Sequence, residues 1–486
     1  MKHPFVAALL LGAATVLGFA PFGLFPLPIL ALALLFQLWR RAASPRAAAF
    51  LGFAWGLGFF LAGVSWVYVS QHDVGGMALP LAALATLLFC AYLALFPALA
   101  GWLFARFKCG QPWRDALLAA GAWMLAEWLR GWLFTGFPWL ALGYSQSPPS
   151  PLAGFAPVVG SYGIAFIAAL IAGLLGLAWK QMWPALAVVG IVAAGAMLRG
   201  MAWTQPVGEP LTVALLQGNV PQNLKWDPQK LGLSIDTYLA LARAHPAQLT
   251  VLPETAIPLM FDQVPREILR GLTANGDVML GVAVRLAQGG YVNGAVALNS
   301  ELRSQGYAKS HLVPFGEFVP PGFAWFFNLV RIPMSDFTAG PLQQPTLAIA
   351  GQKIAPNICY EDLFGEQILR ALPEATLLVN LSNTAWFGDS LAQPQHLQIS
   401  QMRALETGRP MLRATNTGMT AAVAPDGSVS GVLPAFTRDA MRVEVRGYTG
   451  LTPYARHGNV LALIIAAVAL FPALLQRRRK VAAVGR

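Results

Sequence analysis

The chain has 486 residues, of which 56% are hydrophobic and only 11% are charged. A soluble globular domain usually carries about 25% charged residues, so this composition argues against a soluble protein and favours a polytopic membrane protein. The net charge is +11, and the excess of positive charge lies in short loops beside apolar stretches. Contact with anionic lipid explains these basic loops, and we expect no nucleic-acid partner.

The first 200 residues contain a series of apolar stretches, and one more follows near the end of the chain. A bilayer core requires roughly 20 apolar residues per helix. The N-terminus has the short basic start of a signal peptide, but further apolar stretches follow directly, so we interpret it as a retained first helix. The eight expected spans are residues 5–19, 23–39, 50–70, 79–104, 114–130, 160–179, 182–198 and 459–475.

Basic residues mark alternate loops of this predicted bundle. They cluster after the second, fourth, sixth and eighth spans, whereas the other loops carry few besides Arg130 and Arg199. The positive-inside rule then places both termini in the cytoplasm. We therefore expect a multi-pass protein of the bacterial inner membrane. Its parts are transmembrane helices at 1–204, a periplasmic domain at 205–457, and a final helix with a basic tail at 458–486.

The periplasmic part has a different pattern, in which short apolar strands alternate with amphipathic helices. This alternation is typical of a layered α/β domain, where polar residues at strand ends form the site. Three strand ends carry such residues: Glu254, Cys359 and the "SNTAW" stretch that begins at Ser382. The expected strands lie within 211–220, 249–255, 278–285, 291–299 and 375–383, and a helix is expected at about 393–408.

Cys359, in "NICYED", is the only cysteine of the periplasmic part, because Cys90 lies in a predicted span and Cys109 in a cytoplasmic loop. Extracytoplasmic cysteines usually pair, so an unpaired one is either a buried apolar filler or a reactive thiol. Its place at a strand end, directly before acidic residues, favours the thiol. A nucleophilic thiol needs a base and an oxyanion stabiliser. His311 and His396 are candidates for the base, but neither lies in a recognisable motif.

Glu254 and Lys309 are better placed than the histidines, although each alone is typical of a surface position. Glu254 ends the strand "VLPE", Lys309 lies in "GYAKSHLVPFGE", and Cys359 follows. "LPET", "KSHLVPFGEFVP" and "NICYED" resemble the three catalytic segments of the nitrilase superfamily. The motifs at 127–146, at 213–227 ("VALLQGNVPQNLKWD") and at 383–398 are similar to those of the apolipoprotein N-acyltransferase family. This resemblance covers nearly the whole chain.

The resemblance implies a polytopic α-helical membrane protein with an inserted nitrilase-like αββα domain. It also implies a two-step acyl transfer. The Cys359 thiolate takes an acyl chain from a phospholipid, typically phosphatidylethanolamine, and passes it to the α-amine of a diacylglyceryl-cysteine on an apolipoprotein. Glu254 is the implied general base, and Lys309, with the backbone N–H of Tyr360, stabilises the oxyanion. We expect a monomer, no metal and no dissociable cofactor.

Supporting roles rest on the same resemblance. Glu317 is implied to be a second carboxylate that orients Lys309, although a surface glutamate is the alternative. Trp226 is either a residue of the lipid entrance or a core aromatic. The further residues that match positions used by the family are Asn293, Tyr360 and Glu361.

Three alternatives stay open. A membrane-tethered amidase would use the same three residues, but one span would suffice to anchor it. A transporter would carry ionisable residues within its spans, and Glu127 is nearly the only one here. The aromatic segment 320–337 is either a lid on the membrane surface or a helix of the core.

Overall fold

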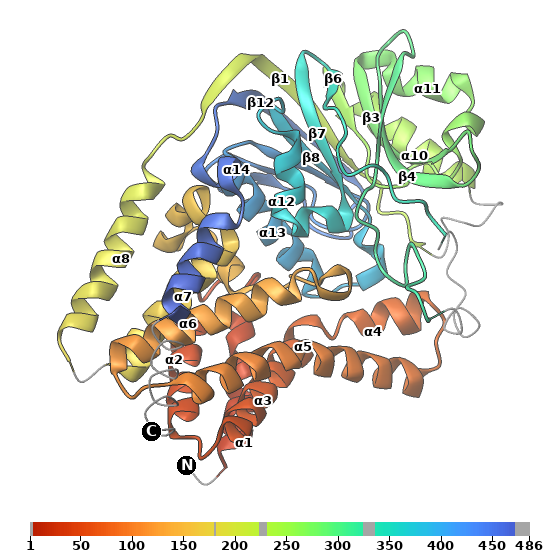
Figure 1. The fold of residues 1–486 in the computed structure, drawn as a ribbon. Helices are drawn as coiled ribbons and strands as arrows, with labels where there is room; N and C mark the ends of the chain where they lie inside the picture. The colour runs from red at the N-terminus through yellow and green to blue at the C-terminus, as the bar shows by residue number, and fades with distance from the viewer. Residues whose placement is uncertain (1–2, 179–180, 223–230, 324–335, 472–486) are drawn as a thin grey trace. The chain divides into compact units, whose positions relative to one another are not determined.

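The computed structural model describes residues 3–178, 181–222, 231–323 and 336–471 (Figure 1). It divides into two compact units. The first contains residues 1–65, 83–201 and 456–486, and the second contains residues 66–82 and 202–455. Residues 66–82, which connect two apolar helices in the sequence, therefore group with the second unit.

The first unit is helical, and within the described residues each of the eight apolar stretches overlaps a helix. Proline lies in the first turn of most of them, where its missing N–H costs no hydrogen bond. In the part of the chain that the structure describes, three segments are long and apolar enough to cross a membrane: Pro45–Val64, Leu79–Phe107 and Pro151–Leu177. The number of eight spans stays a prediction. The helices are α1 (Pro4–Thr15), α2 (Pro26–Arg41), α3 (Pro45–Val64), α5 (Leu79–Phe107), α6 (Pro112–Arg130), α7 (Ala156–Leu177), α8 (Trp183–Arg199) and the segment Val460–Phe471.

Two six-stranded sheets form the second unit. In each sheet three parallel strands lie at the centre and antiparallel strands flank them. The first sheet has the order β12 (Asp439–Thr449), β1 (Gln205–Gln217), β2 (Leu249–Val251), β3 (Asp277–Arg285), β4 (Tyr291–Leu298) and β5 (Ser304–Ala308). The second has the order β11 (Val429–Val432), β10 (Ala421–Val423), β9 (Met411–Thr415), β8 (Leu377–Ser382), β7 (Gln352–Ile358) and β6 (Leu347–Ile349).

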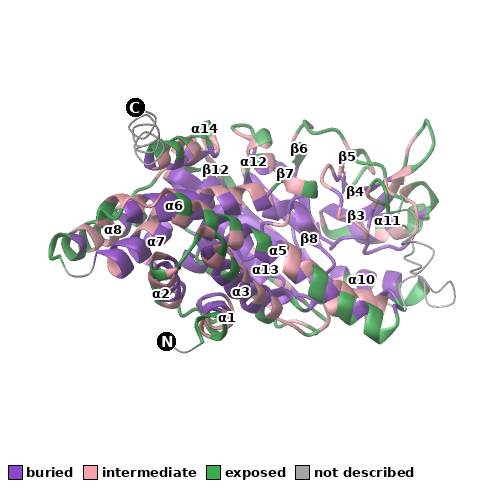
Figure 2. Ribbon diagram, turned by 60° about the horizontal axis from the view of Figure 1, so that its bottom comes forward, coloured by how far each residue is buried: buried purple, intermediate pink, exposed green. Residues whose placement is uncertain are grey.

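The two sheets pack face to face through apolar side chains. Along β1, Val213 and Leu215 point into the layer between the sheets, whereas Ala214 and Leu216 face outward. This alternation follows from the two-residue period of a strand. Helices α10 (Leu231–Ala244) and α11 (Arg266–Leu272) cover the outer face of the first sheet, and α13 (Ala392–Thr407) covers that of the second (Figures 1 and 2). The expected αββα layering is present.

Strand direction brings distant residues to one edge of each sheet. Strands β1, β2 and β3 run parallel, so the segment after β2 lies beside the end of β3. The antiparallel hairpin β4–β5 returns the chain to the same edge, where the Lys309 N–H donates to the Asn293 carbonyl at 2.8 Å. In the second sheet, β7 and β8 both end at the edge that carries Cys359 and Asn383.

The layer between the sheets gives a test of this packing. Leu377 begins β8 and is fully buried there. We expect Leu377→Ala to reduce the free energy of unfolding by about 2–5 kcal/mol, because it leaves a cavity, and so to lower the melting temperature in detergent. Leu233→Ala is the control, since this side chain on α10 is 44% exposed. Equal melting temperatures for the two variants would contradict the packing.

Candidate active site

A buried lysine held between two carboxylates forms the centre of the site. The Lys309 ammonium lies 2.8 Å from one Glu317 oxygen and 3.6 Å from Glu254 Oε1, and its side chain is only 1% exposed. Burial by itself would lower the pKa of Lys309, but Glu317 and Glu254 overcome this effect and raise it. Lys309 is therefore a permanent cation at any physiological pH.

Asn293 on β4 aligns both carboxylates. Its Nδ2 donates to Glu254 Oε1 and to Glu317 Oε1, each at 2.7 Å. Two carboxylate acceptors require the amide nitrogen at this position, which fixes how the side chain is turned. Asn293 therefore holds the two carboxylates on either side of Lys309.

Backbone N–H groups occupy the remaining oxygens of the two carboxylates. The Asn383 N–H donates to Glu254 Oε2 at 2.9 Å, and the Val313 N–H donates to Glu317 Oε2 at 2.8 Å. Asn383 directly follows β8 of the second sheet, so a residue of one sheet orients a carboxylate carried by the other.

Cys359 directly follows β7 and has a left-handed backbone, with φ +53°. Few residues other than glycine adopt this region, and such conformations concentrate at functional positions. Burial raises the pKa of the Cys359 thiol, Glu254 raises it further, and Lys309 opposes both. The thiol is consequently protonated at neutral pH and needs a base to become a nucleophile.

Glu361 ties the turn at Cys359 to the segment that follows Lys309. The sequence places Glu361 beside the nucleophile. In the structure its carboxylate accepts hydrogen bonds from five donors of the described residues. These donors are Tyr307 Oη at 2.9 Å, Ser310 N at 2.7 Å, Ser310 Oγ at 2.9 Å, His311 N at 3.2 Å and Ile358 N at 2.8 Å. Burial raises the pKa of Glu361, whereas Lys309 and the backbone donors lower it. Glu361 therefore connects the loop that follows Lys309 to the turn that carries Cys359.

The two histidines make their described contacts with groups other than the thiol. His311 stacks on Phe364, with 3.7 Å between the ring centroids, and the centroid of the Tyr360 ring lies 5.6 Å from that of His311. His396 contacts Asp362 through Nε2 at 2.7 Å and Arg413 through Nδ1 at 2.6 Å. Both ring nitrogens of His396 are thus engaged with groups other than the sulfur.

The network around His396 was not predicted from the sequence. Asp362, Arg413 and Asn380 join it, and all are buried. A signal was available: Arg413 is a charged residue within the apolar strand "MLRAT", and a buried arginine requires an anionic partner. Asp362 is the second of the two acidic residues that follow Cys359 in "NICYED".

Two expected features lie outside the described residues. Trp226 is one of them, and most of the aromatic segment 320–337 is the other. Of that segment, Phe323 is described: its ring is 5.2 Å from that of Phe315, and the residue is 42% exposed.

Within the described residues, no group of three or more histidine, cysteine, aspartate and glutamate side chains is arranged to hold a metal ion.

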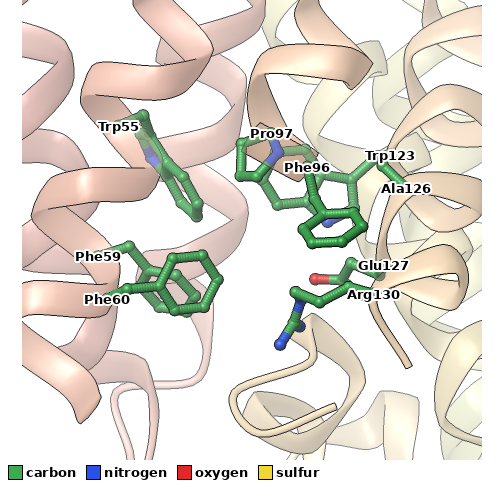
Figure 3. A pocket seen from close by; sticks show the side chains of 9 residues that line it. All are labelled: Trp55, Phe59, Phe60, Phe96, Pro97, Trp123, Ala126, Glu127 and Arg130. Carbon is green, nitrogen blue, oxygen red and sulfur yellow. The ribbon is translucent and has the colours of Figure 1, made fainter. Parts of the chain in front are cut away.

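Glu127, an ionisable residue within the predicted spans, has structural contacts. Its carboxylate accepts the Leu142 N–H at 3.0 and 3.2 Å. Arg130 donates to the carbonyls of Phe137 and Trp139 at 2.6 and 2.7 Å. Both side chains thereby anchor the loop that follows α6. They line a pocket of the first unit (Figure 3) together with Trp55, Phe59, Phe60, Phe96, Pro97, Trp123 and Ala126.

The charges around Cys359 predict opposite shifts of its pKa. Glu254→Gln removes a negative charge and should lower the pKa of the thiol, whereas Lys309→Met removes a positive charge and should raise it. The pH dependence of alkylation by iodoacetamide would report this pKa. A Cys90→Ala, Cys109→Ala background leaves Cys359 as the only thiol. Shifts in the same direction for the two variants would contradict the arrangement.

Two sequence families match the chain. The family described as apolipoprotein N-acyltransferase N-terminal domain matches residues 11–174, and the carbon–nitrogen hydrolase family matches residues 212–454. The resemblance to the nitrilase superfamily is thereby confirmed for the second unit, which has a carbon–nitrogen hydrolase fold with two sheets.

Relatives and solved structures give further comparisons. An apolipoprotein N-acyltransferase of Nitrosomonas europaea is 50% identical over 476 residues, which are 95% of each chain. Another, from Ralstonia nicotianae, is 49% identical over 492 residues, covering 98% of this chain and 94% of the relative. A carbon–nitrogen hydrolase superfamily structure from Xanthomonas campestris is 18% identical, with a TM-score of 0.38, and covers 55% of this chain and 97% of its own. The two full-length relatives show that the chain belongs to the apolipoprotein N-acyltransferase family.

Proposed function

We propose that the protein transfers an acyl chain from a phospholipid, through a thioester on Cys359, to the α-amine of a diacylglyceryl-cysteine at the N-terminus of an apolipoprotein. The observation that carries this proposal is the buried Glu254–Lys309–Glu317 cluster, whose charges act directly on the Cys359 thiol. A base, a fixed cation and a nucleophile are the groups that acyl transfer to and from sulfur requires.

In the first step Glu254 takes the proton of the thiol. The sulfur then attacks the ester carbonyl, and the carbonyl oxygen becomes an oxyanion. Lys309 and the Tyr360 N–H stabilise this charge. When the tetrahedral intermediate collapses, the C–O bond of the ester breaks and the lysophospholipid oxygen takes the proton back from Glu254. The product is an acyl-enzyme with the acyl chain on Cys359.

In the second step an amine replaces the thiol as the nucleophile. Glu254 accepts a proton as the neutral α-amine attacks the thioester carbonyl, and the same two groups stabilise the oxyanion. Collapse breaks the C–S bond, and the leaving sulfur recovers a proton from Glu254. The enzyme returns to its initial protonation state. No dissociable cofactor is needed, because the acyl carrier is the enzyme's own cysteine.

Glu317 and Glu254 have different tasks in this scheme although both contact Lys309. Glu317 is the closer partner, at 2.8 Å against 3.6 Å, and remains the counterion of Lys309 throughout. When Glu254 becomes protonated, negative charge moves from its carboxylate to the sulfur, and Lys309 stays paired. Lys309 therefore keeps a counterion while Glu254 carries the proton.

The membrane part of the proposal concerns the origin of the substrate. A phospholipid and a lipid-modified protein are both held in a bilayer, so an enzyme acting on them benefits from membrane helices. We infer a bacterial inner-membrane protein with helices in 1–204 and 458–486 and the catalytic domain, 205–457, in the periplasm. Phosphatidylethanolamine is the proposed donor. The long apolar segments of the first unit support the location in a membrane.

A test of the proposal uses intact-protein mass spectrometry after mixing the enzyme with phosphatidylethanolamine in detergent. The wild-type protein should gain one fatty-acyl mass on Cys359, and a lipopeptide with a free N-terminal diacylglyceryl-cysteine should remove it. Cys359→Ala should gain none, with its melting temperature nearly unchanged, because the substitution removes one sulfur atom from a partly buried site.

Cys109→Ala is the matched control, since it removes a thiol of the first unit, and it should acylate like the wild type. Release of the acyl group as a free fatty acid at the same rate with and without the lipopeptide would favour hydrolysis and contradict the transferase proposal. Acylation of Cys359→Ala would exclude Cys359 as the nucleophile.

A further inference from the structure

A buried network holds the carbonyl group of Cys359. Asn380 Nδ2, on β8, donates to this oxygen at 3.3 Å. His396 Nε2, on α13, lies at 3.3 Å from the same oxygen. Both side chains are at most 1% exposed. Two side chains from separate elements therefore contact the backbone oxygen of Cys359, the residue with the left-handed backbone.

The partners of His396 define its tautomer. Arg413 can only donate, so the Nδ1 atom that it contacts at 2.6 Å must be the acceptor. The proton of the neutral ring then lies on Nε2, which faces Asp362 at 2.7 Å and the Cys359 carbonyl. This one N–H is shared: Asp362 is the closer acceptor and the Cys359 carbonyl is the second, longer one. With Nδ1 accepting from Arg413 and the Nε2 proton shared in this way, His396 is not available as the general base.

Further contacts fix the other donor. Asn380 Nδ2 also donates to Asn357 Oδ1 at 2.6 Å, while Asn380 Oδ1 accepts from Ser382 Oγ at 2.7 Å and from Arg413 Nη1 at 3.0 Å. Because Arg413 contacts both Asn380 and His396, one cation orients both donors. A network with this many mutual contacts permits few alternative side-chain positions.

The geometry of the peptide unit connects this network to the reaction. The Cys359–Tyr360 bond is not among the cis peptide bonds of the described residues. In a trans peptide the C=O and the following N–H lie in one plane and point in opposite directions. Whatever holds the Cys359 oxygen therefore also sets the direction of the Tyr360 N–H.

We propose that Asn380 and His396 are positioning residues that hold the Cys359–Tyr360 peptide plane and so direct the Tyr360 N–H at the oxyanion formed during acyl transfer. This inference rests on the proposed function, because it takes Cys359 as the nucleophile. The contacts given above join both residues to the carbonyl oxygen of Cys359. Their contribution lies in keeping one donor aimed at the position where charge develops.

Two reactions of the same thiol separate this role from a merely structural one. Attack on a short p-nitrophenyl ester creates an oxyanion, whereas alkylation by iodoacetamide displaces iodide and creates none. A misdirected Tyr360 N–H should therefore slow acylation and leave alkylation nearly unchanged. Removal of an oxyanion donor costs about 100- to 1,000-fold in rate, so a misdirected donor should cost about 10- to 100-fold.

The variants are made in the full-length Cys90→Ala, Cys109→Ala protein. Asn380→Asp exchanges one terminal atom, keeps the acceptor for Ser382 and Arg413, and presents an oxygen to the Cys359 carbonyl. His396→Leu removes the second donor, and His396→Gln restores an N–H near the Nε2 position. We expect slow acylation in the first two variants, substantial recovery in His396→Gln, and alkylation within about threefold of the parent in all three, as positioning by remote groups predicts.

Thr407→Val is the matched control. Thr407 is a buried residue of the same helix whose hydroxyl donates to the Arg403 carbonyl at 2.7 Å, and no contact joins it to the network within the described residues. It should leave both rates unchanged. Equal effects on acylation and alkylation, or no effect on either, would overturn the positioning role. If the parent protein with intact Cys359 forms no thioester from the ester or from phospholipid, the proposed function itself fails.

Discussion

The ion pair of Lys309 with two carboxylates, in a place with almost no access to solvent, is the interaction on which the rest of the site depends. A buried ammonium without counterions would lose its proton, because burial disfavours its charged form. Glu317 and Glu254 keep it charged, and they in turn need donors for their remaining oxygens. Asn293 and the backbone N–H groups of Val313 and Asn383 supply these donors. Each requirement follows from the one before it.

Those donors explain why a two-sheet fold suits this chemistry. Asn293 lies in a strand of the first sheet, and Glu254 and Lys309 follow strands of that sheet, whereas Cys359 and Asn383 follow strands of the second. The apolar layer between the sheets fixes the separation of the two edges, so it also fixes the cluster relative to the sulfur. Glu361 adds a direct connection between the loops that carry Lys309 and Cys359. A loss of sheet packing would therefore disturb the site even where no polar contact is changed.

The sequence predicted the residues of this cluster because strand ends with polar residues are recognisable and the order Glu254, Lys309, Cys359 resembles that of a known superfamily. It did not predict the five donors around Glu361, since the most distant of them, Tyr307, is 54 positions away. The network around His396 was not predicted for the same reason, although Arg413 within an apolar strand was a clue. Nor did apolar patterns show that residues 66–82 group with the second unit, because hydropathy does not encode tertiary contacts.

The central claim is that Glu254 and Lys309 act as one unit on Cys359. Single-turnover acylation by a short ester, measured for Glu254→Gln, Lys309→Met and the double variant, tests it most directly. Groups that act together show losses that do not multiply, so each single variant should lose several orders of magnitude and the double variant little more. If the loss in the double variant equals the product of the two single losses, the residues act independently and the account is wrong.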